Sequence, residues 1–253
     1  GHCDFPWFSS NIKLVPEWSQ KMVIIFFVLS GYLIAYSTFE RKKGLRQYWI
    51  DRLSRLYSVV LPALILSYAL GYIVFLKNPE MYEYMVAKDY QVIRATMNLL
   101  FIQEIWNFSV KPSSNVPFWS ISYEFWYYCL FGFFVYSRGI VKKTMVAVCF
   151  FLIVGPKIGL LLPTWLLGVL CYYFNKKARL QLVVSSPLFV MSSLLIVFIC
   201  VTDYALPFHN SSLGSPPSFY SSNFIADWIF AAVVFINVIA FSSFSKRTKI
   251  RLE

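Results

Sequence analysis

Residues 56–76 read LYSVVLPALILSYALGYIVFL, and no charged side chain interrupts them. A helix that crosses a bilayer needs about 20 mostly apolar residues, because it rises about 1.5 Å per residue through a hydrocarbon core about 30 Å thick. Comparable stretches lie on both sides of this one: Lys21–Ser37, Pro117–Ser137, Val141–Gly155, Ile158–Phe174, Leu182–Thr202 and Phe224–Phe244. The two short stretches around Pro156-Lys157 would form a tight helical hairpin or a tilted pair. The sequence therefore predicts an all-α fold, a polytopic transmembrane helical bundle of about seven spans.

The composition excludes an ordinary soluble domain. Hydrophobic residues make up 58% of the 253 residues and charged residues only 14%, against about 25% charged in typical soluble domains. The net charge of +11 would favour nucleic-acid binding in a soluble module. Here the basic residues form short clusters between apolar stretches, which is typical of membrane topology, so we expect membrane lipid and no nucleic acid as a partner. The five cysteines lack zinc-ligand spacing, and we expect no metal site.

Basic side chains gather in alternate connecting segments of the chain. These are segments 38–55, 138–143, 175–181 and 246–251. Seven spans place all of them on one side of the membrane, and the positive-inside rule makes that side cytoplasmic. The opposite side receives most of the acids, in the start of the chain and in segments 77–116 and 203–223. Within segment 77–116, the partly apolar residues 92–108 predict an interfacial or re-entrant helix.

Glu124 is an acid inside a predicted span, in the stretch PFWSISYEFWYY. An ionisable group in hydrocarbon is costly, so such a residue is a functional-site hypothesis by default. Ser120, Glu124 and Tyr128 follow one another at intervals of four residues and would share one helix face. The alternative is a capping arrangement, in which Ser120 or Ser122 begins the helix and Glu124 lies at the interface.

Arg52 and Arg55 stand at the expected cytoplasmic mouth of the second span. A guanidinium group matches the geometry of a phosphate, so the pair is a candidate phosphate site. Ordinary positive-inside anchoring is the alternative explanation. Asp227 is the other acid of a predicted span, but it lies near the start of that span, where we expect an interfacial position.

Three stretches carry a resemblance to one family. Phe26–Ile34 reads FFVLSGYLI, Tyr48–Tyr57 reads YWIDRLSRLY and Phe118–Glu124 reads FWSISYE. In this order they resemble the signature segments of the membrane-bound acyltransferase 3 family, including its Arg-x-x-Arg and Trp-Ser-x-Ser-x-Glu motifs. Tyr123 and Phe125 stand where valine and glutamate are commoner. The resemblance implies one integral membrane acyltransferase domain over residues 1–253, and we expect the family's first and last spans to lie outside the chain.

The resemblance implies an O-acyltransferase of a bacterial inner (plasma) membrane. Such an enzyme moves an acyl group, usually acetyl, from cytoplasmic acyl-CoA to a hydroxyl of an extracytoplasmic or lipid-linked carbohydrate, as in polysaccharide modification. Acyl-CoA would be the donor substrate, and we expect no permanently bound cofactor.

The resemblance also assigns catalytic residues. His2 falls where the family has a histidine after an arginine, and that arginine would precede residue 1. His2 would be the general base on the acceptor hydroxyl, or alternatively the carrier of a covalent acyl group. Glu124 would orient and charge-stabilise His2, and Ser120 would complete the catalytic group.

The remaining expected site residues would bind the donor or shape the substrate site. Arg52 and Arg55 would hold the phosphates of acyl-CoA. Trp119, Ser122 and Tyr128 would shape the substrate site or donate hydrogen bonds in it.

Two other classes of function compete with the enzyme. A transporter or flippase of a glycan-related substrate would show discontinuous helices and midplane charges in two related halves. The sequence has one clear intramembrane acid and no internal repeat, which favours the enzyme. A structural membrane subunit without activity is the second rival.

Overall fold

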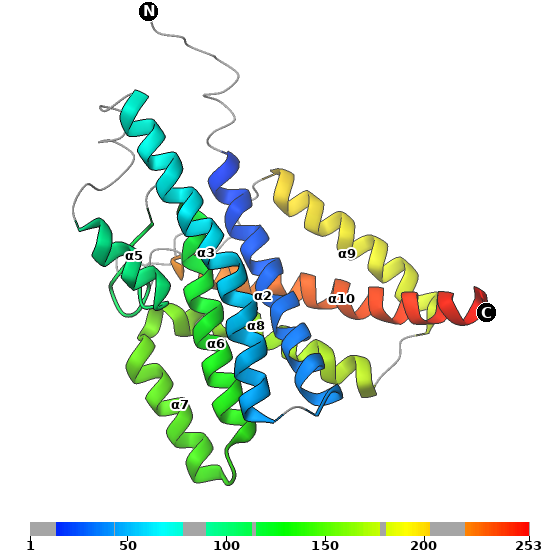
Figure 1. Cartoon of the computed structure of the whole chain (residues 1–253). Helices are drawn as coiled ribbons and strands as arrows, with labels where there is room; N and C mark the ends of the chain where they lie inside the picture. The colour runs from blue at the N-terminus through cyan, green and yellow to red at the C-terminus, as the bar shows by residue number, and fades with distance from the viewer. Residues whose placement is uncertain are drawn as a thin grey trace, which may run out of the picture. The chain divides into compact units, whose positions relative to one another are not determined.

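The computed structural model describes residues 14–42, 44–77, 90–112, 115–177, 181–202 and 221–252. Within these ranges every regular element is a helix, which confirms the predicted all-α fold (Figure 1). The helices are α2 (Leu14–Glu40), α3 (Leu45–Lys77), α5 (Gln91–Leu99), the short 3-10 helix η1 (Val116–Phe118), α6 (Trp119–Tyr136), α7 (Ile140–Val154), α8 (Pro156–Lys177), α9 (Leu182–Thr202) and α10 (Phe224–Leu252).

Five stretches of these helices are long and apolar enough to cross a membrane, and the protein is a multi-pass membrane protein. They are Ser19–Glu40, Leu45–Lys77, Pro156–Lys177, Val183–Val201 and Phe224–Ser245. The two remaining predicted spans are helical as well, as α6 and α7. With 15 residues, α7 is shorter than the minimum of about 17 for a span. The predicted number of about seven spans is therefore approximate.

Several helix boundaries differ from the prediction; α2 begins at Leu14 and α10 continues to Leu252, for example. Helix α3 begins at Leu45 and not at Leu56, where the predicted span begins. The basic residues before the span tolerate a helix, and they include neither glycine nor proline. The helix predicted over residues 92–108 ends at Leu99. The chain then turns, and Phe101 and Trp106 adopt positive φ angles of 59° and 48°.

The chain divides into two compact units. Unit 1 contains α2, the part of α8 from Leu161 onward, α9 and α10. Unit 2 contains α3, α5, η1, α6, α7 and the first residues of α8, up to Leu160.

In unit 1, α10 packs against both α9 and α2. The α2 and α8 backbones approach each other most closely at Gly31 and Gly168. A Cβ atom added to Gly31 would overlap the carbonyl oxygen of Trp165, and one added to Gly168 would overlap that of Val28. Glycine is therefore required on both helices of this crossing, as at other close helix contacts in membranes.

In unit 2, α6 packs between α3 and α7. The Tyr48 ring of α3 lies against Gly132, where an added Cβ would stand 2.6 Å from the ring. The Tyr48 hydroxyl donates a 2.8 Å hydrogen bond to the carbonyl oxygen of Tyr128. Tyr48 also contacts the Tyr136 ring near the end of α6, at 5.8 Å between centroids. The start of α3 therefore lies beside the end of α6, and the two helices are antiparallel.

Unit 2 has two chemically different ends. The basic end comprises the start of α3, with Arg46, the turn between α6 and α7, with Arg138, and the first turn of α7, with Lys142 and Lys143. The loop end comprises residues 100–112 and 115–118 and the turn between α7 and α8. Trp106 joins the two parts of the loop end, because its backbone N–H donates to the Val154 carbonyl oxygen at 2.9 Å.

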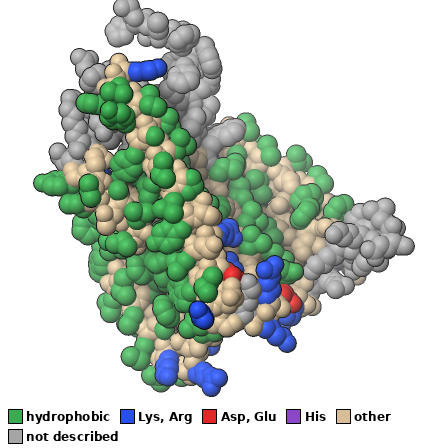
Figure 2. All heavy atoms as spheres, in the orientation of Figure 1, with side chains coloured by type: hydrophobic (Ala, Val, Ile, Leu, Met, Phe, Trp, Pro, Cys, Tyr) green, Lys and Arg blue, Asp and Glu red, His purple; other side chains and the backbone are tan. Residues whose placement is uncertain are grey.

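The exposed surface of the helices is largely apolar. Figure 2 shows hydrophobic side chains over most of the coloured part of the visible face. On α3, for example, Ile65 is 70% and Tyr72 62% exposed. Such a surface would associate in water, whereas lipid tails solvate it.

Candidate active site

The polar face of α6 is buried. Glu124 and Tyr128 lie one turn apart, and the Tyr128 hydroxyl donates a hydrogen bond to Glu124 Oε1. Ser120 is also buried, but its hydroxyl donates to the Pro117 carbonyl oxygen at 3.0 Å, within the turn that begins the helix. The structure thus pairs Glu124 with Tyr128, and Ser120 lies one turn before them on the same face.

The capping alternative for Glu124 does not describe this helix. Helix α6 continues directly from η1, and its first residue follows Phe118, which makes no side-chain capping bond. The hydroxyl groups of Ser120 and Ser122 both donate to backbone carbonyl oxygens. Glu124 is 4% exposed, so it is a buried acid.

Arg52 approaches the same place from α3. Its guanidinium carbon lies 5.8 Å from the ring centroids of both Tyr48 and Tyr128, a distance at which a cation is attracted by an aromatic face. Arg52 is 7% exposed. The side chains of Arg52, Tyr128 and Glu124 therefore follow one another through the interior of unit 2, from the basic end towards the loop end.

Arg52 and Arg55 differ in burial, although both belong to α3. Arg55 is exposed, whereas Arg52 is buried against the two tyrosine rings. Anchoring in a polar headgroup region explains an exposed arginine readily, but it does not explain a buried one. The two positions therefore require separate roles.

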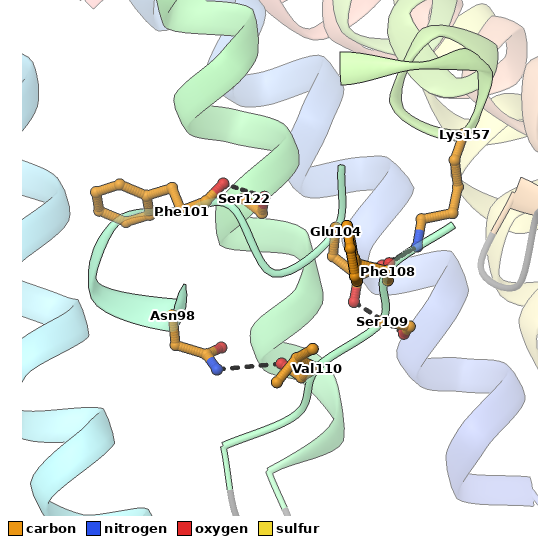
Figure 3. Close-up of polar contacts among 8 residues, drawn as sticks. All are labelled: Asn98, Phe101, Glu104, Phe108, Ser109, Val110, Ser122 and Lys157. Atoms are coloured by element: carbon orange, nitrogen blue, oxygen red, sulfur yellow. Dashed lines mark hydrogen bonds and ion pairs between the residues drawn. The ribbon is translucent and has the colours of Figure 1, made fainter. Parts of the chain in front are cut away.

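Ser122 and Trp119 point away from this face. Ser122 donates to the Phe101 carbonyl oxygen at 2.7 Å (Figure 3), and the Trp126 indole donates to the same oxygen at 2.9 Å. Trp119 is buried and meets the Tyr123 ring edge-on, at 4.9 Å between centroids. Ser122 holds the loop end against α6, and the described contacts of Trp119 are with the aromatic core.

A buried ion pair at the loop end was not predicted. Lys157 Nζ lies 2.6 Å from Glu104 Oε2, and both side chains are 1% exposed. Lys157 also donates to the Phe108 carbonyl oxygen, and Ser109 donates to Glu104 at 3.0 Å (Figure 3). Burial raises the pKa of Glu104 above its ordinary 4.5, while Lys157 and Ser109 oppose that rise.

The sequence does hold a signal for this pair. Glu104 is the only charged residue between Arg94 and Lys111, and Lys157 is the only one between Lys143 and Lys176. Single opposite charges in two mostly apolar stretches predict that each is the partner of the other, because a lone buried charge is costly.

Other candidate residues lie elsewhere. His2 is outside the described residues, so its position relative to Glu124 stays a prediction. Asp227 belongs to unit 1 and is 6% exposed. It accepts a 3.2 Å hydrogen bond from the Gln20 amide. Asp227 lies in the first turn of α10, and its expected position at the membrane interface stays a prediction.

An apolar groove of about 290 Å³ lies between α6 and α7, lined by residues that include Trp126, Cys129 and Phe133. These three residues occupy the face of α6 opposite to Glu124. Its lining consists of apolar side chains and two cysteines and includes no carboxylate, histidine, lysine or arginine. We therefore place the candidate active site on the Glu124 side of α6.

Comparison with known proteins agrees with the signature segments. No curated protein and no solved structure matches the chain significantly. A family profile described as an acyltransferase domain matches residues 1–251, which include both units and all the residues discussed above. With its signature segments and almost its whole length matched, the chain belongs to the acyltransferase 3 family.

Proposed function

We propose that this protein is an O-acetyltransferase that uses acetyl-CoA from the cytoplasm and a carbohydrate hydroxyl on the other side of the membrane. The family supports acyl transfer in a membrane. The observation that carries the site is the buried succession of Arg52, Tyr128 and Glu124, which extends from the basic end of unit 2 into its interior. We further propose a bacterial inner (plasma) membrane, with the basic end in the cytoplasm.

The two arginines would act at different depths. Arg55 is exposed and would bind the phosphates of acetyl-CoA at the basic end. Arg52 is buried beside Tyr128 and would stabilise negative charge inside the site, either on Glu124 or on the thioester oxygen as it gains charge. This division follows from the burial of the two side chains.

The reaction would form one C–O bond and break one C–S bond. The acceptor oxygen attacks the thioester carbonyl carbon, and His2 takes the hydroxyl proton as general base. CoA leaves as a thiolate, which recovers a proton from His2. Glu124, held by Tyr128, would orient His2 and stabilise its charged form. In the runner-up route His2 first carries the acetyl group itself.

The test is acetyl transfer from radiolabelled acetyl-CoA by the full chain in proteoliposomes. Glu124→Gln and His2→Asn should each lower kcat by about 100-fold or more, the size expected for loss of acid–base assistance. Glu40→Gln is the matched control, because Glu40 is 43% exposed, and Tyr172 and Lys176, which bind it, belong to unit 1. Full activity of Glu124→Gln would refute the proposed site.

A further inference from the structure

The apolar groove between α6 and α7 is open along its side. Among its lining residues Phe133 is 48%, Met145 60% and Ile153 49% exposed, and Cys149 is exposed as well. A molecule can therefore enter the groove from the surroundings of the helices. In a membrane protein the hydrocarbon of the bilayer provides those surroundings, so the acyl chain of a lipid can reach this site.

The length of the groove matches the depth of one leaflet. On α7 its lining extends from Met145 to Ile153, a distance of about 12 Å at a rise of about 1.5 Å per residue. Half of the hydrocarbon core is about 15 Å thick. The groove has a volume of about 290 Å³. It therefore offers an acyl chain a seat over most of the depth of one leaflet.

Two lysines stand at the basic end of the groove. Lys142 precedes the lining residue Val146 by four positions, so both share one face of α7. The Lys143 Nζ atom lies 5.0 Å from the centroid of the Phe134 ring, and Phe134 follows the lining residue Leu130 by one turn of α6. The apolar seat thus ends at cationic side chains contributed by the first turn of α7.

The cations at this end have no carboxylate to neutralise them. The sequence contains no acid between Glu124 and Asp203. Among the described residues, no carboxylate forms an ion pair with Arg138, Lys142 or Lys143. A lysine ammonium binds phosphate as a point charge, and basic pockets between helices at the cytoplasmic face bind anionic lipid headgroups. The charge at the end of the groove therefore favours an anionic lipid over a zwitterionic one.

We propose that the groove and its two lysines bind one anionic phospholipid. An acyl chain would lie along the groove, and the phosphate would lie beside Lys142 and Lys143. The site is on the face of α6 opposite to Glu124. The inference therefore goes beyond the proposed function, and lipid binding does not depend on acyl transfer.

The test is photo-crosslinking of the full chain in nanodiscs of phosphatidylcholine. The nanodiscs contain a small fraction of phosphatidylglycerol that carries a diazirine in its acyl chain, and mass spectrometry of peptides locates the adducts after irradiation. We expect adducts on the lining residues of α6 and α7. Added unlabelled phosphatidylglycerol should displace the probe, whereas more phosphatidylcholine should not.

Two variants test the two parts of the site separately. Lys142→Gln should lower the affinity for phosphatidylglycerol about fivefold, the size expected for one basic residue near an anionic headgroup. Lys177→Gln is its matched control, because Lys177 is an exposed lysine at the end of α8, outside the groove. Val146→Trp fills part of the groove and should also reduce the adducts. Val148→Trp is its control, since Val148 is 52% exposed on α7 but does not line the groove.

The outcomes decide between a specific site and ordinary solvation by lipid. Adducts that fall in Lys142→Gln but not in Lys177→Gln support the site, whether or not acetyl transfer is detected. Equal displacement of the probe by both lipids, or equal yields in the two lysine variants, overturns it. Absence of adducts from the groove also overturns it, because another occupant, such as a second copy of the chain, then covers the groove. If Val146→Trp does not elute as a single species, the exposed lysine variants decide alone.

Discussion

The Tyr128 hydroxyl donates its hydrogen bond to Glu124 Oε1, and both side chains are buried in α6. The four-residue spacing brings them together, and the Arg52 guanidinium stands beside the same tyrosine ring. A carboxylate in such a place depends on its neighbours for stabilisation, because water does not reach it. Tyr128 is therefore a positioning residue for Glu124 and not only part of the core.

Replacing Tyr128 with phenylalanine should separate this role from packing. The variant Tyr128→Phe keeps the ring under Arg52 but removes the donor to Glu124. We expect kcat to fall about tenfold or more with little change in the KM for acetyl-CoA, since acid–base assistance depends on the carboxylate's orientation. Steady-state transfer assays at varied acetyl-CoA measure both constants.

The neighbouring variant Tyr127→Phe is the control. Tyr127 is equally buried but donates to the Ile158 carbonyl oxygen at 2.8 Å, on another side of α6. Loss of the Tyr127 hydroxyl should lower stability by about 1–3 kcal/mol, because a buried carbonyl loses its partner. It should leave kcat nearly unchanged. An equal fall of kcat in both variants would contradict the special role of Tyr128.

The two arginines should respond differently to substitution. Arg52→Lys places a compact ammonium where a planar guanidinium lies between two rings, and we expect a loss of about tenfold in kcat. Arg55→Ala should instead raise the KM for acetyl-CoA, and raised salt should weaken wild-type acetyl-CoA binding in the same way, because exposed ion pairs are screened. A matching kinetic defect in both variants would show that they act as a pair after all.

The α2–α8 crossing gives a prediction about assembly. Gly31→Ala and Gly168→Ala each force a methyl group against a backbone carbonyl, which cannot move like a side chain. We expect each to destabilise the protein by at least about 1–3 kcal/mol, the usual range for overpacking, with a lower thermal midpoint in detergent. Gly44→Ala is the control, because an added Cβ there meets nothing within 4 Å. Wild-type behaviour of Gly31→Ala would show that the helices separate at no cost.

Much of the fold follows from hydropathy, because lipid demands long apolar helices. The break between α7 and α8 falls at Gly155, one residue before the predicted break at Pro156-Lys157. Hydropathy detects a span, however, and not the helix that continues beyond it. The start of α3 at Leu45 was missed for this reason. The left-handed backbone of Phe101 and Trp106 was also missed, since tertiary contacts and not local pattern impose it.

The candidate site was partly predictable. The spacing of Glu124 and Tyr128 predicts their contact, and the same helical periodicity places Ser122 on another face, as the structure has it. The approach of Arg52 to Tyr128 could not be predicted, because it depends on how α3 packs against α6. The segment order in the chain contains no information about that packing.

The Glu104–Lys157 pair leads to a prediction about stability and pH. Lys157→Met leaves Glu104 buried without its cation, and removal of one partner of a buried pair typically costs about 3–5 kcal/mol. Because burial raises the pKa of Glu104 above 4.5, the folded protein holds the proton more tightly than the unfolded chain does. The contribution of Glu104 to the free energy of unfolding is therefore greatest below that ordinary value and falls as the pH rises through the raised pKa.

The loss of stability with rising pH should be steeper in Lys157→Met than in the wild type, because Lys157 opposes the rise in the pKa of Glu104. Thermal midpoints in detergent, followed by intrinsic fluorescence from about pH 4 to about pH 8, measure this dependence. The double variant Glu104→Gln with Lys157→Met removes the titrating group and should regain most of the stability at neutral pH. A midpoint of Lys157→Met that rises with pH, or a double variant no more stable than the single one, would contradict the assignment of Glu104 as the buried partner of Lys157.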